Sequence, residues 1–265
     1  MDDVQRDVQR RNLLALAQSP GGFQFTKTFF PYTSGEIGPY YVQSAAIMAD
    51  GHNYAIACED MANMVRDTLG QDWKGIISGG ESRDWVFSGP VAGRLHFPGT
   101  WIYKDGKVIG ASMKDNNVAH VADLNNEGSS PRDLWMPVIK REGGNIRHIF
   151  FYVDRLEDGV DVMKQLGLES HSIIPLDEYA WDQLQIAGTI DKETYQSLRL
   201  RMEDKEKWAE RMLRSAEGIE TLIALVASGK TREKGLKVLA SYPNLRDELT
   251  CKIKQYAPGV RRWLE

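Results

Sequence analysis

The sequence predicts a mixed α/β fold, in which a parallel sheet flanked by helices over residues 1–177 is followed by an all-helical extension over residues 178–265. Two observations support this prediction. Before about Leu176, short β-type runs alternate with helical segments, which is typical of a parallel sheet covered on both faces. After that point only helical patterns occur. The 265 residues are enough for one large domain or for a smaller core with an appendage.

Each expected element of the first part combines a hydrophobic period with residues that end it. Helices are expected where apolar residues recur at helical spacing, and strands where short apolar runs meet glycine or polar loops. The expected helices cover residues 5–17, 54–69, 85–95, 131–142 and 158–166. The expected strands cover residues 75–78, 100–103, 117–121, 146–153 and 171–175. Because ligands of such sheets bind beyond the carboxyl ends of the strands, the loops that follow them are the candidate site.

The second part contains only helix candidates. They cover residues 191–213, 217–227, 231–240 and 245–256. Asp191 and Thr194 suit a helix start, and Gly229 suits a stop. The charged stretch 199–214 also carries Trp208, and we interpret it as a solvated helix packed by one face. A partner-binding face is the alternative interpretation.

The composition is that of a globular protein. Apolar residues make up 42% and charged residues 26%, which excludes a disordered chain, and the net charge of −4 argues against a protein that coats nucleic acid. Cys58 and Cys251 have neither metal-site spacing nor disulfide density, so we expect free thiols in the cytoplasm. Apolar stretches are too short to span a bilayer, and the charged N-terminus lacks an export signal, so no membrane partner is expected.

The most informative loop follows the strand at residues 117–121. Asp123 stands at the strand end, where its carboxylate could accept hydrogen bonds from sugar hydroxyls. Gly128 and Ser130 lead into a helix with Pro131 at its first position, and the amides of such a helix start favour a bound phosphate. The alternative is an ordinary strand–loop–helix turn, in which Ser130 caps the helix and Asp133 completes a capping box.

Two further loops carry groups suited to anions. Gly79 and Gly80 end a strand, permit backbone shapes that other residues avoid, and let amides approach an anion, while Arg83 adds a fork of donors. Lys104 and Lys107 flank an Asp-Gly pair after the next strand and could neutralise charge on a leaving group. The alternatives are a plain tight turn for the first loop and a solvated hairpin for the second.

Two other features could contact a planar ring. Tyr40 and Tyr41 follow a Gly-Pro pair and could stack on a base, although such a pair more often packs in a core or at an edge. Arg155 follows an aspartate at a strand end, and this pair is usually structural.

Together, in this order, these stretches resemble the type I phosphoribosyltransferases, and within them the orotate phosphoribosyltransferase branch, over about residues 13–177. The matching segments are 25–41, 103–110, 118–130, 128–144 and 153–157. The resemblance implies the type I phosphoribosyltransferase fold, with residues 1–45 forming an N-terminal helix and hood element. It also implies a homodimer that acts on phosphoribosyl pyrophosphate (PRPP) and a nitrogenous base, orotate or a related ring, in pyrimidine nucleotide biosynthesis.

The resemblance further assigns roles to residues. It implies catalytic roles for Lys107 and Asp123, and Mg²⁺ held through PRPP, near Asp123, without a direct protein ligand. The residues implied to bind PRPP or its phosphates are Gly79, Gly80, Arg83, Lys104, Asn126, Gly128, Ser129 and Ser130. Those implied to contact the base are Tyr40, Tyr41 and Arg155.

The sequence departs from the family pattern at several positions. The first of two adjacent acids is Ala122, the usual threonine is Asn126, and Glu127 adds negative charge beside the phosphate loop. Two function hypotheses follow. The first is a phosphoribosyltransferase that releases pyrophosphate. The second is a catalytically inactive protein of the same fold, which binds a nucleotide or sugar phosphate and acts through its helical extension.

Overall fold

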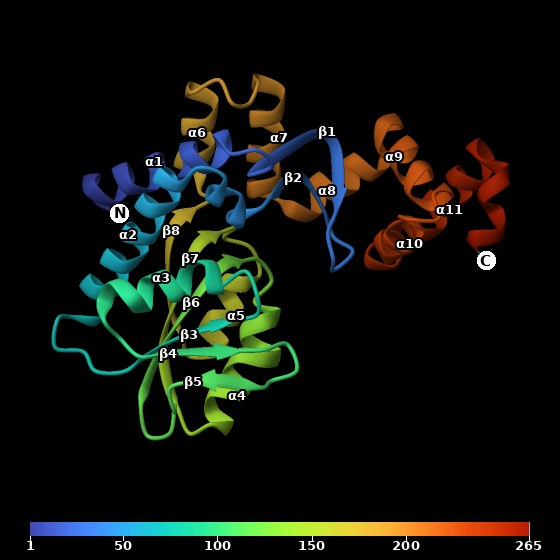
Figure 1. Cartoon of the computed structure of the whole chain (residues 1–265). Helices are drawn as coiled ribbons and strands as arrows, with labels where there is room; N and C mark the ends of the chain where they lie inside the picture. The colour runs from blue at the N-terminus through green and yellow to red at the C-terminus, as the bar shows by residue number, and fades with distance from the viewer. Residues whose placement is uncertain (265) are drawn as a thin grey trace. The chain divides into compact units, whose positions relative to one another are not determined.

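The computed structural model describes residues 1–264, which form two compact units (Figure 1). The first unit comprises residues 1–22 and 43–184, and the second comprises residues 23–42 and the chain from Gln185 onward. This division differs from the expected boundary at residue 177. Residues 23–42, which were expected in the N-terminal domain, group with the C-terminal helices.

A six-stranded sheet forms the centre of the first unit, in the order β5-β4-β3-β6-β7-β8. Its strands are β3 (Ile76–Gly80), β4 (Gly99–Ile102), β5 (Val108–Gly110), β6 (Asn117–Asn125), β7 (Asn145–Asp154) and β8 (Glu169–Pro175). All neighbours pair in parallel except β5, which is antiparallel to β4. The expected parallel sheet is confirmed, with β5 as an additional edge strand.

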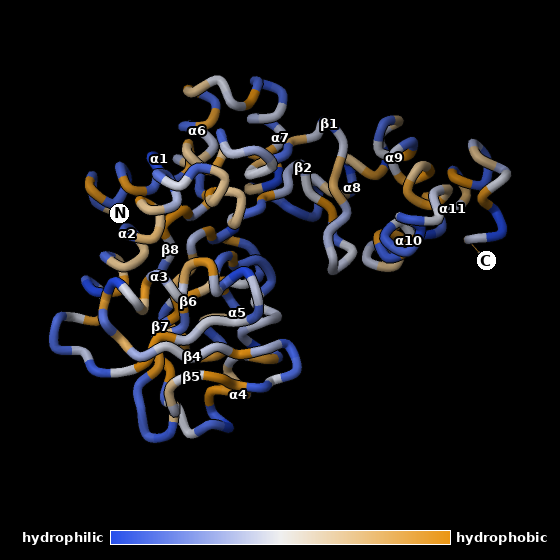
Figure 2. Tube along the Cα trace, viewed as in Figure 1, coloured by the Kyte–Doolittle hydropathy of each residue, from blue (hydrophilic) through white to orange (hydrophobic). Residues whose placement is uncertain are grey.

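Helices cover both faces of this sheet. They are α1 (Asp3–Gln18), η1 (Ser44–Ala49), α2 (Gly51–Leu69), α3 (Trp85–Leu95), η2 (Pro131–Trp135), α4 (Met136–Arg141), α5 (Gly159–Gln165) and α6 (Glu178–Ile186). Because side chains alternate along a strand, Phe151 packs with Trp135 of η2 while Tyr152 donates to Asn12 of α1 and stacks on Phe87 of α3. Burial on both faces explains the unbroken apolar run of β7. Figure 2 shows hydrophobic residues gathered on the central strands and hydrophilic residues in many connecting loops.

The helix expected over residues 131–142 divides into two parts. The N–H of Met136 donates to the carbonyl of Pro131, which is the wider spacing of a π-helix, and regular α-helix follows. Pro137 accounts for this difference, because it has no N–H to donate to the carbonyl four residues earlier.

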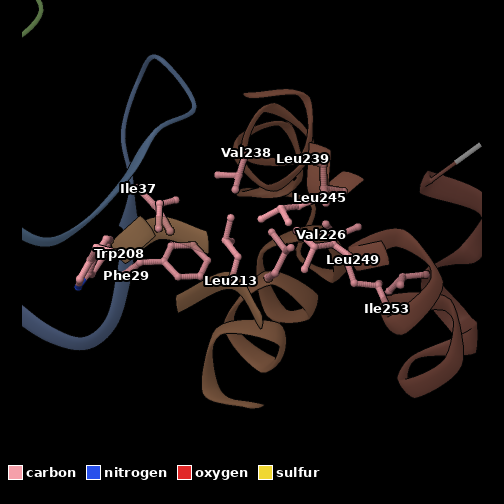
Figure 3. Close-up of a cluster of buried hydrophobic side chains, with 13 residues drawn as sticks. Phe29, Ile37, Trp208, Leu213, Val226, Val238, Leu239, Leu245, Leu249 and Ile253 are labelled. Atoms are coloured by element: carbon pink, nitrogen blue, oxygen red, sulfur yellow. The ribbon is translucent and has the colours of Figure 1, made fainter. Parts of the chain in front are cut away.

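The second unit combines a hairpin with helices. Its elements are β1 (Phe23–Pro31), β2 (Ile37–Val42), α7 (Lys192–Glu203), α8 (Lys205–Arg214), α9 (Ala216–Ala227), α10 (Arg232–Ser241), α11 (Pro243–Tyr256) and η3 (Pro258–Trp263). Phe29 and Ile37 of the hairpin belong to the same buried apolar cluster as Leu213 and Val238 of the helices (Figure 3). At the hairpin tip, Lys237 donates to the carbonyl of Thr33. The hairpin is therefore part of this unit's core.

The helix expected over residues 191–213 is interrupted at Asp204. The Asp204 carboxylate accepts from the N–H of Lys207, 2.9 Å away, and so caps a new helix. Both cysteines are free, with Cys58 buried and Cys251 exposed, as expected. Among the described helices, none is both long enough and apolar enough to cross a membrane.

Candidate functional site

The loop after β3 is shaped by close packing. A Cβ at Gly79 would lie 2.1 Å from Ser88 Oγ, and a Cβ at Gly80 would lie 2.2 Å from Trp135 Nε1. Neither glycine is among the residues with positive φ. We expected these glycines to supply unusual backbone shapes, but the structure requires them because neighbouring side chains approach the chain closely.

This loop places Asp84 against Asp123, which lies near the carboxyl end of β6. Asp84 Oδ2 accepts from the N–H of Gly80 at 2.9 Å, and Asp84 Oδ1 accepts from the N–H of Asp123 at 3.0 Å. Ser44 Oγ of η1 donates to Asp123 Oδ2 at 2.6 Å. The two aspartates are only 4% and 8% exposed, so the structure contains a buried pair of carboxyl groups.

Burial changes the acidity of this pair. It raises the pKa of both carboxyl groups from 3.8 to about 7, and the charge of Asp84 adds to the rise for Asp123. The exposed Arg83 opposes this effect, because its positive charge lowers the pKa of both groups. The pair therefore retains a proton at neutral pH, where an isolated aspartate would be ionised.

His120 adds to the buried polar network around the Asp84–Asp123 pair. Its Nδ1 lies 2.9 Å from Ser78 Oγ, its Nε2 lies 3.7 Å from Asp84 Oδ2, and its ring stacks on Trp135. Burial lowers the pKa of His120 to about 3, so the imidazole is neutral. In one tautomer Nδ1–H donates to Ser78, and Nε2 then presents an acceptor toward a protonated Asp84.

The lysine segment is a closed hairpin turn beside the β3 loop. The N–H of Tyr103 donates to the carbonyl of Lys107 at 2.8 Å, and the N–H of Lys104 donates to Glu81 Oε2 at 2.9 Å. Arg141 Nη2 donates a hydrogen bond to the carbonyl of Gly106 at 2.6 Å. The hairpin interpretation is confirmed. Both lysine side chains are exposed, and the bond from Lys104 to Glu81 joins this turn to the loop that carries Arg83.

The expected phosphate loop has a different helix start from the one predicted. Ser130 has helical backbone angles and no side-chain cap, and the carboxylate of Asp133 binds Arg132 at 2.7 and 2.9 Å. The predicted capping box is therefore wrong, because the helical turn already begins at Ser129 and Asp133 pairs with Arg132 instead. Gly128 does adopt a positive φ of 68°, and a Cβ there would lie 2.7 Å from Val162. Ser129 and Ser130 are exposed.

Two polar side chains flank that loop. The side-chain amide of Asn126 donates to Glu127 Oε1 at 3.4 Å.

Ala122, the position at which the family pattern has an acid, is fully buried among apolar side chains. Its cluster includes Trp135, Phe151 and Met163. The second carboxyl group beside Asp123 comes instead from Asp84. We did not single out Asp84, Ser44 or His120 from the sequence. The available signal for Asp84 was an acid four residues after the glycine pair that ends a neighbouring strand.

The residues expected at the base are distributed over both units. Arg155 lies at the end of β7 in the first unit, is buried, and pairs with Glu157 at 2.9 Å. Tyr40 and Tyr41 lie on β2 in the second unit. Tyr40 is only 2% exposed, whereas Tyr41 is 38% exposed, so Tyr41 is the tyrosine with a ring accessible for stacking.

Comparison with known proteins agrees with the expected family. The chain is 24% identical over 193 residues to an orotate phosphoribosyltransferase of Roseobacter denitrificans, covering 68% of this chain and 84% of the relative. It is 26% identical over 172 residues to an orotate phosphoribosyltransferase of Staphylothermus marinus, covering 62% and 80%. No family model matches the chain.

Solved structures show the same fold. The orotate phosphoribosyltransferase of Aeropyrum pernix has a TM-score of 0.55 at 20% identity, covering 67% of this chain and 99% of that one. Leishmania donovani UMP synthase has a TM-score of 0.64 at 16% identity, covering 72% of this chain and 41% of that longer chain. The Mycobacterium tuberculosis orotate phosphoribosyltransferase, solved in complex with PRPP, has a TM-score of 0.50 at 15% identity, covering 64% and 96%. The chain thus has the type I phosphoribosyltransferase fold, and it is similar in sequence to orotate phosphoribosyltransferases.

Proposed function

We propose that this protein transfers ribose 5-phosphate from PRPP to orotate or a related nitrogenous base, with release of pyrophosphate, in pyrimidine nucleotide biosynthesis. One observation carries the proposal. Asp84 of the buried carboxyl pair directly follows the exposed Arg83, and the turn with Lys104 and Lys107 is hydrogen-bonded to Glu81 of the same loop. The names of the relatives, and the PRPP complex of the M. tuberculosis enzyme, support this choice of substrate.

Three exposed cations would receive the pyrophosphate. Arg83, Lys104 and Lys107 belong to neighbouring loops at the carboxyl ends of β3 and β4. As the bond between ribose and pyrophosphate breaks, negative charge grows on the leaving oxygen. Fixed cations near that oxygen stabilise the transition state more than the ground state.

The carboxyl pair would hold the ribose. A pair that shares one proton both donates and accepts, which suits the two hydroxyl groups of a ribose ring. A negative carboxyl at this place also stabilises the positive charge that develops on the sugar carbon. We propose that Asp84 takes the place of the acid that is absent at residue 122.

The loop from Asn126 to Ser130 would hold the 5-phosphate. The hydroxyl groups of Ser129 and Ser130 are exposed, and the loop leads directly into the helical turn of η2. Hydroxyl and amide donors at this place are suited to phosphate oxygens. We further propose that Arg155 contacts the base, and that the active form is a homodimer.

The carboxyl oxygens of Asp84 and Asp123 do not suit Mg²⁺ as direct ligands, so the ion would be bound mainly by oxygens of the substrate. Carboxylate oxygens are preferred ligands of Mg²⁺, but both oxygens of Asp84 accept backbone N–H groups and Asp123 Oδ2 accepts from Ser44. We therefore propose that Mg²⁺ is held by PRPP oxygens and water near Asp123. When bound there, it would neutralise charge on the pyrophosphate.

One observation favours the second hypothesis, binding without transfer. The lysine turn is short and closed, and Arg141 holds its tip through the carbonyl of Gly106. A turn held in this way has less freedom to close over a substrate. Binding and turnover must therefore be measured separately.

The decisive experiment is calorimetric titration of the full chain with PRPP, with and without Mg²⁺, together with a spectroscopic assay of orotate consumption. We expect magnesium-dependent micromolar binding that Asp123→Ala weakens, and turnover that Lys107→Ala reduces by at least about tenfold. Lys74→Ala, an exposed lysine before β3, is the matched control. Binding without turnover of any base would favour the second hypothesis. Absence of PRPP binding would refute both the transferase and the proposed sugar-phosphate loop.

A further inference from the structure

A second cluster of ligating side chains lies elsewhere on the same sheet. His148 is on β7, and Glu169 and His171 are on β8. His148 is paired with Glu169 in the parallel ladder, and Phe150 is paired with His171. Glu169 begins its strand, so the cluster lies toward the amino ends of the strands, whereas the carboxyl pair lies at the carboxyl ends.

The three ligand atoms lie close enough together to contact one metal ion. His148 Nδ1 lies 3.3 Å from His171 Nε2 and 3.7 Å from Glu169 Oε2, and all three atoms lie within 4.8 Å of one another. Bonds of about 2.0–2.2 Å in a tetrahedral zinc site place neighbouring ligand atoms about 3.3–3.6 Å apart. We propose that His148, Glu169 and His171 bind a divalent transition-metal ion, with Zn²⁺ as the best match, and leave a fourth position for water.

The surroundings of the cluster support this assignment. Arg147 binds Glu169 Oε1 at 2.7 Å, which orients the carboxylate and leaves Oε2 toward the histidines. The ring of Phe150 stacks on the His171 ring at 5.0 Å and on the His148 ring at 6.3 Å, which restricts both imidazoles. Two imidazoles and one carboxylate are a donor set that zinc prefers over magnesium.

One positive charge lies beside the cluster. The Arg147 guanidinium lies 2.6 Å from Glu169 Oε1. Arg147 also repels a cation, so its charge should weaken the site without removing a ligand.

A cavity gives the cluster a route to solvent. His171 lines a cavity of about 860 Å³ that is also lined by Val4 of α1 and by Asp60 and Met64 of α2. All of these residues belong to the first unit. A small ligand in that cavity could therefore reach an ion bound at His171.

The experiment is titration of the chelator-treated full chain with Zn²⁺ by calorimetry, and with Co²⁺ by visible absorption. We expect one ion per chain at micromolar affinity and a cobalt spectrum of tetrahedral nitrogen and oxygen ligands. His148→Gln and His171→Gln should each weaken binding at least about tenfold. His52→Gln, which changes an exposed histidine on α2, is the matched control and should leave the affinity unchanged.

Two further measurements make the result decisive. Arg147→Gln should retain or strengthen zinc binding, because it removes a positive charge while all three ligands remain. A cobalt spectrum dominated by thiolate charge transfer would assign the ion to the exposed Cys251 and overturn the proposal. The proposal would also be overturned if the wild type bound no zinc, or if both histidine variants bound zinc as tightly as the wild type. PRPP binding should be the same in all these variants, so this test is independent of the proposed transferase activity.

Discussion

The substitution Asp123→Asn changes the charge of the buried pair while preserving its shape. The asparagine oxygen can still accept from Ser44, and the new amide can donate to Asp84. The variant therefore removes one acidic group and the repulsion within the pair, and leaves the hydrogen bonds largely in place. Its stability should depend less on pH than that of the wild type.

The sign and size of this effect follow from the pKa of Asp123. Burial, and then the charge of Asp84, raise that pKa from 3.8 to about 7 in the folded protein. The folded state therefore binds the proton more tightly than the unfolded state. The contribution of the Asp123 carboxyl group to the free energy of unfolding is fully present below pH 3.8 and is lost as the pH rises toward 7. Each pH unit in this window is worth about 1.4 kcal/mol for one proton.

Urea unfolding at about pH 5 and about pH 8 measures the effect. Over this range the wild type should lose about 3 kcal/mol more unfolding free energy than Asp123→Asn. In thermal unfolding this corresponds to a difference of roughly 10 °C in Tm. Asp72→Asn, which changes an exposed acid, is the control and should follow the wild type. Identical pH dependence in Asp123→Asn and the wild type would refute the view that the pair retains a proton.

Three other substitutions test the structure. Ala122→Asp should lower the free energy of unfolding by at least about 3 kcal/mol, because it places a charge among apolar side chains. It should not increase the affinity for PRPP, and tighter PRPP binding would contradict this prediction. Gly80→Ala should lower both the free energy of unfolding and the affinity for PRPP, since its Cβ would collide with Trp135. Gly89→Ala, where a Cβ meets nothing within 4 Å, is the control in the unfolding and calorimetry measurements. Asp204→Ala should cost about 1 kcal/mol through loss of a helix cap, and unchanged urea unfolding would argue against the break between α7 and α8.

Much of the first unit could be predicted from local patterns. The alternation of apolar runs with helical segments predicted the parallel sheet, and the Asp-Gly pair indicated the hairpin at Lys104 and Lys107. Asp123 could be singled out because it is the first acid after the apolar run of an expected strand. These features depend on residues close together in the sequence, so periodicity and turn chemistry suffice to find them.

Other features depended on which segments meet in space. Asp84 is 39 positions before Asp123, and their contact exists because β3 and β6 pair in parallel. The hairpin at residues 23–42 joined the helical unit because Phe29 and Ile37 found apolar partners there.

The sequence by itself thus determined the class of fold, most of its strands, and the loops that carry charged side chains. Only the tertiary structure decided that Asp84 and Asp123 form a buried pair and that His148, Glu169 and His171 converge. The physical reason is the separation along the chain over which each effect acts. Backbone preference and hydrophobic period act between neighbours along the chain, whereas burial, pKa and ligand geometry depend on side chains that distant segments bring together.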